Sequence, residues 1–153
     1  MADIVAPAVR SRMMAGITGK NTKPEIAVRK ALHRMGYRFR LHSKRLPGKP
    51  DLVFPKHQAA VFVNGCFWHG HDCHLFRLPA TRSDFWREKI EANRKRDARN
   101  RERLRDEGWR VAEIWECAIR GRDRLPFEAV IDECASWLTG SDRRLELRGK
   151  RDA

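Results

Sequence analysis

The sequence contains no apolar stretch long enough to cross a membrane. Its first residues, Met1 to Val5, also lack the basic start and apolar run of a secretion signal. Both absences predict a protein of the reducing cytoplasm, where disulfides are rare. The 4 cysteines are therefore expected to bind a metal or to remain free thiols.

Internal repeats and long linkers are also missing, and 153 residues suffice for one domain with a real core. Glycines and basic residues in the first twenty positions indicate a weakly structured arm, and charge dominates the last positions. We therefore expect an N-terminal arm over 1–20, a single domain over 21–140 and a loose charged tail over 141–153.

Acidic residues are few relative to basic ones. The chain has 33 Lys and Arg against 20 Asp and Glu, a formal net charge of +13. Such an excess repels itself in the folded state, and a polyanion is the usual compensating partner. The basic residues alternate with other types instead of forming one block, which favours a folded basic face. Nucleic-acid binding is the favoured interpretation, and a generically basic protein is the alternative.

Hydrophobic periodicity and capping residues predict an α/β fold, a small mixed β-sheet flanked by helices. Thr22 and Ser83 are the expected helix caps, and Gly36, Gly108 and Gly140 the expected stops. The expected elements are, in order, a helix from Thr22 to Gly36, strands over 37–42, 51–54 and 59–63, a long helix over 83–107, a strand over 111–115 and a helix over 126–138.

A loop rich in metal ligands follows the apolar strand at 59–63. Its closely spaced candidate zinc ligands are Cys66, His71 and Cys73. Cys117, at the end of the strand over 111–115, is the candidate fourth ligand if the two strands are neighbours. Three thiolates and one imidazole leave no position for water, as in structural zinc sites. His69 and His74 compete with His71 for the nitrogen position, and four buried free thiols are the alternative. Cys134 is expected in the core.

A carboxylate at Asp51 opens another apolar strand. Beside main-chain carbonyls of a neighbouring strand end, it offers the oxygen ligands that suit Mg²⁺. The Pro50-Asp51 pair is similar to the start of the PD-(D/E)xK nuclease signature. The second half is missing, because Val63, Asn64 and Gly65 stand where an acid and a lysine are expected. His69 titrates near neutral pH and is the candidate general base, with a surface histidine of no role as the alternative.

Aromatic residues lie between the metal ligands. Phe67 and Trp68, joined by Trp86 of the long helix, are placed to wedge between base pairs, or else to cover the zinc loop as a local cluster. The long helix also has a stripe with apolar ends and a polar middle, which indicates either a groove or a solvated face. The stripe consists of Trp86, Ile90, Asn93, Asp97, Arg101 and Leu104.

These segments together resemble the bacterial very short patch repair endonucleases. Those enzymes nick DNA beside a T·G mismatch that arises when 5-methylcytosine deaminates. The resemblance runs from about Val9 to about Leu138 in the family's order and spacing. The segments that carry it are Arg10-Ser11, Asn21 to Glu25, Leu46 to Asp51, Gly65 to His69, Pro79 to Arg82 and Trp115 to Cys117.

The resemblance implies a Mg²⁺-dependent site in a restriction-endonuclease-like core. Asp51 and the main-chain carbonyl of Val63 would hold magnesium, His69 would activate water, and Glu25 would support the hydrated cation. Asn64 departs from the family, where a histidine or a carboxylate occurs, so an acid or base role there is in doubt. The implied zinc ligands are Cys66, His71, Cys73 and Cys117.

The resemblance also implies how DNA is held. Phe67, Trp68 and Trp86 would intercalate from the major groove and Met14 would approach from the minor groove, while Lys89 and Asn93 would read base edges. The implied protein is a cytoplasmic, nucleoid-associated monomer with mismatch-repair proteins as candidate partners. Three rival functions remain. They are a nuclease of the same fold that cuts undamaged sites, a zinc-stabilised DNA-binding module without catalysis and, more distantly, a basic RNA- or ribosome-associated protein, which would leave Asp51 and His69 without a role.

Overall fold

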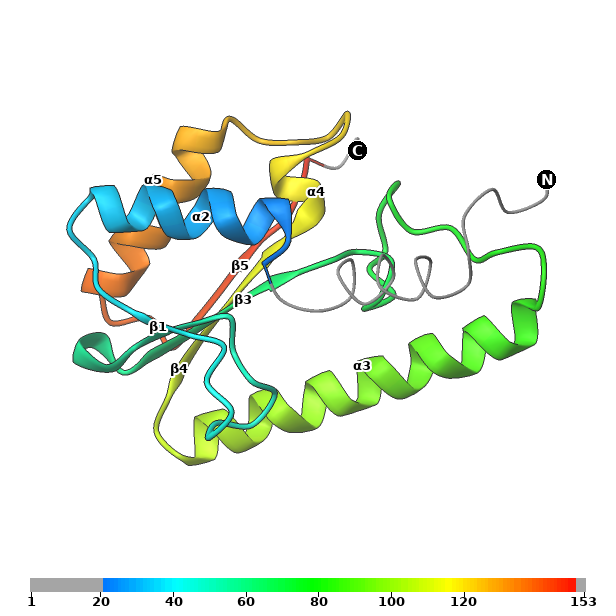
Figure 1. Cartoon of the computed structure of the whole chain (residues 1–153), viewed down its shortest axis with the longest axis horizontal. Coiled ribbons are helices and arrows are strands. Elements are labelled where there is room, and N and C mark those ends of the chain that lie inside the picture. The colour runs from blue at the N-terminus through cyan, green and yellow to red at the C-terminus, as the bar shows by residue number, and fades with distance from the viewer. Residues whose placement is uncertain (1–20, 151–153) are drawn as a thin grey trace.

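A sheet of five strands in the order β1-β2-β3-β4-β5 lies at the centre of the computed structural model, which describes residues 21–150 (Figure 1). The elements are α2 (Lys23–Arg34), β1 (Arg40–Leu41), β2 (Leu52–Phe54), the 3-10 helix η1 (Pro55–His57), β3 (Ala59–Asn64), α3 (Ser83–Asp106), β4 (Arg110–Trp115), α4 (Glu116–Ile119), α5 (Phe127–Thr139) and β5 (Arg144–Leu147).

The sheet is mixed, as expected. β1, β2 and β3 are antiparallel neighbours, whereas β3, β4 and β5 run parallel. Asn64 at the end of β3 lies opposite Trp115 at the end of β4. The ends of these strands, and the start of antiparallel β2, therefore meet at one edge of the sheet. The candidate site residues follow or precede these strand ends.

Helices cover both faces of the sheet. α2 and α5 lie together on one face, and α3 runs along the other and extends past the sheet (Figure 1). Leu104 holds the C-terminal part of α3 against Ala60 and Val111 of the sheet, and it is fully buried. The N-terminal part of α3 contacts the loop that follows β3.

The start of α2 agrees with the sequence. The hydroxyl of Thr22 accepts a hydrogen bond from the N–H of Glu25, and Pro24 lies in the first turn. Val28 and Leu32 are fully buried against the sheet. The expected cap of α3 is wrong, because Ser83 is its first helical residue and Arg82 occupies the cap position without a side-chain hydrogen bond.

Three further expectations need correction. The strand predicted over 37–42 is reduced to β1, because the residues before it pack on the core without a neighbouring strand. α4 was not predicted. The chain after Ser141 was expected to be loose, yet Arg144–Leu147 pair with β4 as β5, and Leu147 is buried. β-pairing of a short, charged segment is decided by its neighbour and not by its own pattern.

Candidate active site and metal centre

Asp51 reaches across the edge of the sheet to the end of β3. Its Oδ2 accepts a hydrogen bond of 2.7 Å from the N–H of Val63. Burial raises the pKa of Asp51 to about 7, the Val63 N–H opposes that rise, and the negative charge of Glu25 adds to it. A smaller opposing effect on the pKa of Asp51 comes from the charge of His69, which lies in the loop that leaves the same edge of the sheet at the end of β3.

Glu25 is buried beside Asp51, with a relative exposure of 1%. Its Oε1 accepts from the N–H of Asn21, and its Oε2 lies 2.9 Å from Arg29 and 2.7 Å from Nε2 of His42. A buried carboxylate needs such partners to remain charged. Glu25, His42 and Asp51 have ligand atoms that all lie within 4.8 Å of one another, and the set can hold a metal ion.

His69 is oriented by α3. Its Nδ1 lies 2.5 Å from Oδ2 of Asp97, and its ring meets that of Trp115 edge to face. Asp97 belongs to the polar middle of the α3 stripe. A carboxylate on Nδ1 leaves Nε2 as the atom that can exchange a proton with a ligand or a water molecule.

Asn64 is nine-tenths buried and held by a second pair of charged residues. Its amide nitrogen donates to Oε2 of Glu113 at 3.3 Å, and Arg101 lies 3.2 Å from the same oxygen. Burial raises the pKa of Glu113, and the charge of Arg101 opposes that rise. Asn64, Asp97, Arg101 and Glu113 line a cavity of about 20 Å³, which has room for a water molecule.

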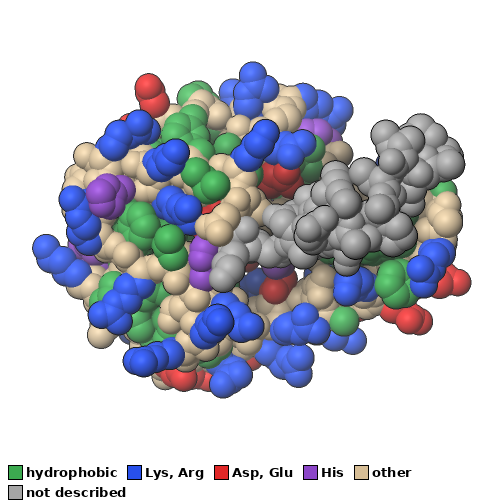
Figure 2. All heavy atoms as spheres, viewed as in Figure 1, with side chains coloured by type: hydrophobic (Ala, Val, Ile, Leu, Met, Phe, Trp, Pro, Cys, Tyr) green, Lys and Arg blue, Asp and Glu red, His purple; other side chains and the backbone are tan. Residues whose placement is uncertain are grey.

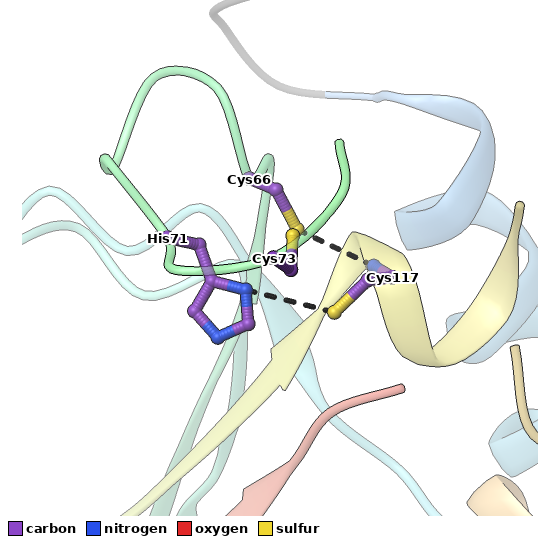
Figure 3. Close-up of side chains that lie close together, drawn as sticks. All are labelled: Cys66, His71, Cys73 and Cys117. Atoms are coloured by element: carbon purple, nitrogen blue, oxygen red, sulfur yellow. Dashed lines mark hydrogen bonds between the residues drawn. The ribbon is translucent and has the colours of Figure 1, made fainter. Parts of the chain in front are cut away.

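The predicted zinc ligands converge on one point. Cys66, His71 and Cys73 come from the loop after β3, and Cys117 from the first turn of α4 (Figure 3). Their ligand atoms all lie within 4.8 Å of one another. Nδ1 of His71 lies 3.6 Å from Sγ of Cys117. The parallel pairing of β3 with β4 brings the fourth ligand to the other three, as the sequence predicted.

The thiols of the cluster interact with one another: the pKa of Cys117 is lowered, whereas burial and the neighbouring Cys117 raise the pKa of Cys73. The hydrogen bond from Cys66 lowers the pKa of Cys117 to about 4, while the pKa of Cys66 is raised by the same contact. Nδ1 of His71 and the N–H of Gly149 also face Sγ of Cys117. Thiolates are the form in which cysteine binds metal, and the three sulfurs with one imidazole match a closed tetrahedral zinc set.

The two competing histidines have other partners. His69 is held by Asp97, and Nδ1 of His74 lies 3.0 Å from Asp123. The structure therefore selects His71, whose ring stacks on Trp115 at a centroid distance of 3.9 Å. Cys134 is fully buried in the apolar core, where burial raises its pKa to about 12, in agreement with its predicted structural role.

The residues that follow β5 pack against this cluster. The N–H of Gly149 donates to Sγ of Cys117 at 3.3 Å, and a Cβ at position 149 would lie 2.5 Å from the carbonyl oxygen of Cys117. Arg148 donates to the side chain and carbonyl of Asp72. The segment expected to be loose is thus part of the wall around the cysteines.

The aromatic residues form one cluster at the N-terminal end of α3. Phe67 lies 5.0 Å from Trp68 and 5.5 Å from Trp86, between ring centroids, and the two tryptophans lie 5.7 Å apart. All three side chains are half-buried, whereas the neighbouring Phe85 is 44% exposed. A Cβ on Gly70 would lie 2.5 Å from Ile90, so glycine there lets the loop press against α3.

Three further residues, Lys89, Asn93 and Met14, were predicted to contact DNA. Lys89 is exposed on α3. The amide nitrogen of Asn93 donates to the carbonyl of Trp68, so this side chain holds the aromatic loop to α3. Met14 lies outside the described residues.

Sequence reasoning missed four residues of this edge. The expected strands over 37–42 and 111–115 include His42 and Glu113 but predict no role for either. The stripe on the long helix includes Asp97 and Arg101 but does not indicate their partners. A buried acid at Glu113 in an apolar strand is the one signal that could have prompted a search for a cation opposite it.

Comparison with known proteins identifies the family. The family model for the DNA mismatch endonuclease Vsr matches residues 2–75. The DNA mismatch endonuclease Vsr of Escherichia coli is 44% identical over 147 residues, covering 96% of this chain and 94% of that protein. The chain belongs to the Vsr family of DNA mismatch endonucleases.

Two further relatives of this chain bear the name of type II nicking enzymes. The type II nicking enzyme V.XorIIP of Xanthomonas oryzae pv. oryzae is 54% identical over 119 residues, covering 78% of this chain and 88% of that protein. The type II nicking enzyme V.NmeAIP of Neisseria meningitidis is 43% identical over 122 residues, 80% of this chain and 87% of that protein.

Membership of the Vsr family establishes the chain as an enzyme that acts on DNA and decides against a non-catalytic binding module. None of the helices within residues 21–150 is long and apolar enough to span a membrane.

Proposed function

We propose that this protein is a Mg²⁺-dependent endonuclease that nicks duplex DNA on the 5′ side of the thymine in a T·G mismatch, as in very short patch repair. The observation that carries the proposal is the meeting of Asp51 and Glu25 at one edge of the sheet, from which the loop with His69 and the half-buried aromatic rings leaves β3.

Asp51, with the main-chain carbonyl of Val63, would hold magnesium, and Glu25 would bind its water ligands. Magnesium, when bound, withdraws charge from the scissile phosphate and favours attack by water. The N–H of Val63 fixes the Asp51 carboxylate at Oδ2, and the cation would take the place of the side-chain hydrogen bond between Asp51 and Glu25. Because the pKa of Asp51 is raised to about 7, a fraction of the molecules carries a proton on Asp51 at neutral pH. Cation binding displaces this proton.

His69 would accept the proton of the attacking water at Nε2. Asp97 holds the ring through Nδ1 and stabilises the imidazolium that forms. Asn64 has no proton to exchange near neutral pH. Because its amide nitrogen is bound to Glu113, its carbonyl oxygen is the atom it can offer to a water molecule.

The aromatic cluster would open the duplex. Phe67, Trp68 and Trp86 are half-buried and fixed by the cysteine loop and α3, so they can enter a base step without a large loss of side-chain entropy. A wobble pair is less costly to unstack than a matched pair, which favours insertion at a mismatch. Lys89 and Asn93 would contact the neighbouring bases, and Met14 would approach from the other groove.

The charge of the surface supports a DNA substrate. Lys and Arg side chains are spread over most of the face in Figure 2, and the chain as a whole carries a formal +13. Contacts from such side chains to phosphates supply affinity that does not depend on sequence. Specificity for the mismatch must therefore come from the aromatic cluster and its neighbours.

The cysteine cluster would hold a structural zinc ion. The ligand set is Cys66, His71, Cys73 and Cys117, with none of the four positions left for water. Zinc would fix the loop that carries Phe67, Trp68 and His69, so that one ion orders both the wedge and the base.

A direct test removes the carboxylate at Asp51. The Asp51→Ala variant should nick a T·G duplex at least about a thousandfold more slowly with Mg²⁺, because the cation loses its direct side-chain ligand. Affinity for the same duplex should stay within a few-fold of wild type in a gel-shift assay. Asp106→Ala, an exposed acid at the end of α3, is the matched control. Undiminished nicking by Asp51→Ala would refute the proposal.

A further inference from the structure

A histidine outside the expected site completes a second set of metal-binding side chains. His42 follows β1, and its Nε2 lies 2.7 Å from Oε2 of Glu25. With Asp51, these residues bring three ligand atoms within 4.8 Å of one another. The side chain of His42 is 16% exposed, so it is aimed into the protein and not into solvent.

The backbone fixes His42 in this position. Its φ angle is +48°, in the left-handed region that residues other than glycine seldom adopt. Its N–H donates to the carbonyl of Asp51 at 3.0 Å, which continues the pairing of β1 with β2. Such conformations are retained where the surroundings or the function demand them. The turn therefore brings the imidazole against Glu25, with its ligand atom within 4.8 Å of that of Asp51.

The donor set differs from one made for magnesium alone. Mg²⁺ binds carboxylates and keeps several waters, whereas imidazole is a ligand of transition metals. We propose that Glu25, His42 and Asp51 form a site that binds Mn²⁺ directly, with Nε2 of His42 as a ligand, and that this nitrogen makes the protein favour Mn²⁺ over Mg²⁺. The proposal rests on the proposed function in one respect, since Asp51 is the carboxylate assigned there to the catalytic cation.

A bound ion would replace hydrogen bonds within the set. Oδ2 of Asp51 accepts from Val63, and the ion would take the place of the side-chain hydrogen bond between Asp51 and Glu25. Arg29 and the N–H of Asn21 stay on Glu25 and offset part of its charge. Nε2 of His42 must carry no proton to bind, so the ion replaces its hydrogen bond to Glu25 and the neutral ring keeps its proton on Nδ1.

The test measures ion binding without DNA, on full-length, zinc-loaded protein. Mn²⁺ binding is followed by the loss of the free-ion EPR signal, and Mg²⁺ binding by competition with Mn²⁺. Wild type should bind Mn²⁺ at least about tenfold more tightly than Mg²⁺, and His42→Gln should weaken Mn²⁺ binding about tenfold while changing Mg²⁺ binding less than about twofold. His33→Gln, which removes an exposed histidine of α2, is the matched control and should change neither.

Pulsed EPR of the Mn²⁺-loaded wild type provides a readout that needs no variant. A ¹⁴N coupling from a directly bound imidazole is the expected signature. Its absence, or equal Mn²⁺ affinity in wild type and a folded His42→Gln, overturns the inference. Nicking of a T·G duplex with Mg²⁺ is assayed separately on wild type. Nicking without the ¹⁴N coupling defeats the inference alone, whereas the coupling without nicking supports it and defeats the proposed function.

Discussion

At the scale of single residues, the environment of Asp51 decides how the site responds to pH. Burial raises its pKa from the model-compound value of 3.8 to about 7. Between these values the folded state holds a proton that the unfolded state has lost. Asp51 therefore lowers the stability of the protein as pH rises from about 4 to about 7, and a bound cation removes this cost.

Asp51→Asn should accordingly stabilise the protein at high pH. Asparagine can still accept from the N–H of Val63 but carries no charge to bury. In urea unfolding of zinc-loaded protein without added magnesium, the gain in free energy of unfolding should be about 3 kcal/mol larger at pH 8 than at pH 5. A gain that is the same at both pH values would show that Asp51 ionises as it does in an unfolded chain.

Asp97→Asn should separate catalysis from binding. The carboxylate of Asp97 sets the tautomer of His69, and an amide can hold the ring in the wrong one. The expected loss is about a hundredfold or more in kcat for nicking, with affinity for the T·G duplex within about twofold. Asp106→Asn is the control. A loss of affinity with unchanged kcat would place Asp97 in DNA binding instead.

At the scale of elements, the pairing of β3 with β4 builds the cysteine cluster. The loop after β3 supplies three ligands and α4 supplies Cys117. Since Cys66, Phe67, Trp68 and His69 are consecutive, the cluster would fix the proposed wedge and the proposed base through the backbone between them. Loss of the cluster should therefore disturb both functions together.

Cys117→Ser tests this link. The variant should lose bound zinc and unfold at a much lower temperature, because folding and metal binding are coupled at a closed site. Zinc content and thermal unfolding by circular dichroism are the measurements. Cys134→Ala, which removes a buried thiol far from the cluster in sequence, should keep its zinc. If Cys117→Ser retains zinc and its melting temperature, Cys117 is not a ligand.

Elements with strong local signals were predictable from sequence. α2 has its cap, proline and buried stripe, β3 is apolar throughout, and α3 is long and ends before a glycine. β5 could not be predicted, because a charged segment of four residues becomes a strand only when β4 offers its edge. The prediction that Ser83 caps α3 was wrong for a similar reason. α3 begins at Ser83 without a capping hydroxyl, after Arg82 at the end of the preceding loop.

The residues of the candidate site also fall into those that the sequence predicts and those that it does not. Spacing in the chain brought Cys66, His71 and Cys73 together, and strand order added Cys117. The contacts of His42 with Glu25 and of Asp97 with His69 join elements that are distant in sequence, and no local pattern encodes them. The choice of His71 over its neighbours likewise needed the positions of Asp97 and Asp123.

At the scale of the whole molecule, the candidate catalytic residues and the aromatic cluster are neighbours on one loop and one helix. His69 directly follows Phe67 and Trp68 in the loop after β3, and its partner Asp97 lies on α3 together with Trp86. The Lys and Arg side chains spread over the face in Figure 2 would attract any duplex. Under the proposed function, cleavage is confined to the mismatch because insertion of the rings is least costly there.

The most direct measurement is a nicking assay on end-labelled duplexes that differ at one base pair, with the two strands resolved. With Mg²⁺, the T·G duplex should give a single product, cut on the 5′ side of the mismatched thymine. The complementary strand, the G·C duplex and the A·T duplex should stay intact, as should every duplex without a divalent ion. Equal cutting of a matched duplex, or of both strands, would contradict mismatch-directed nicking.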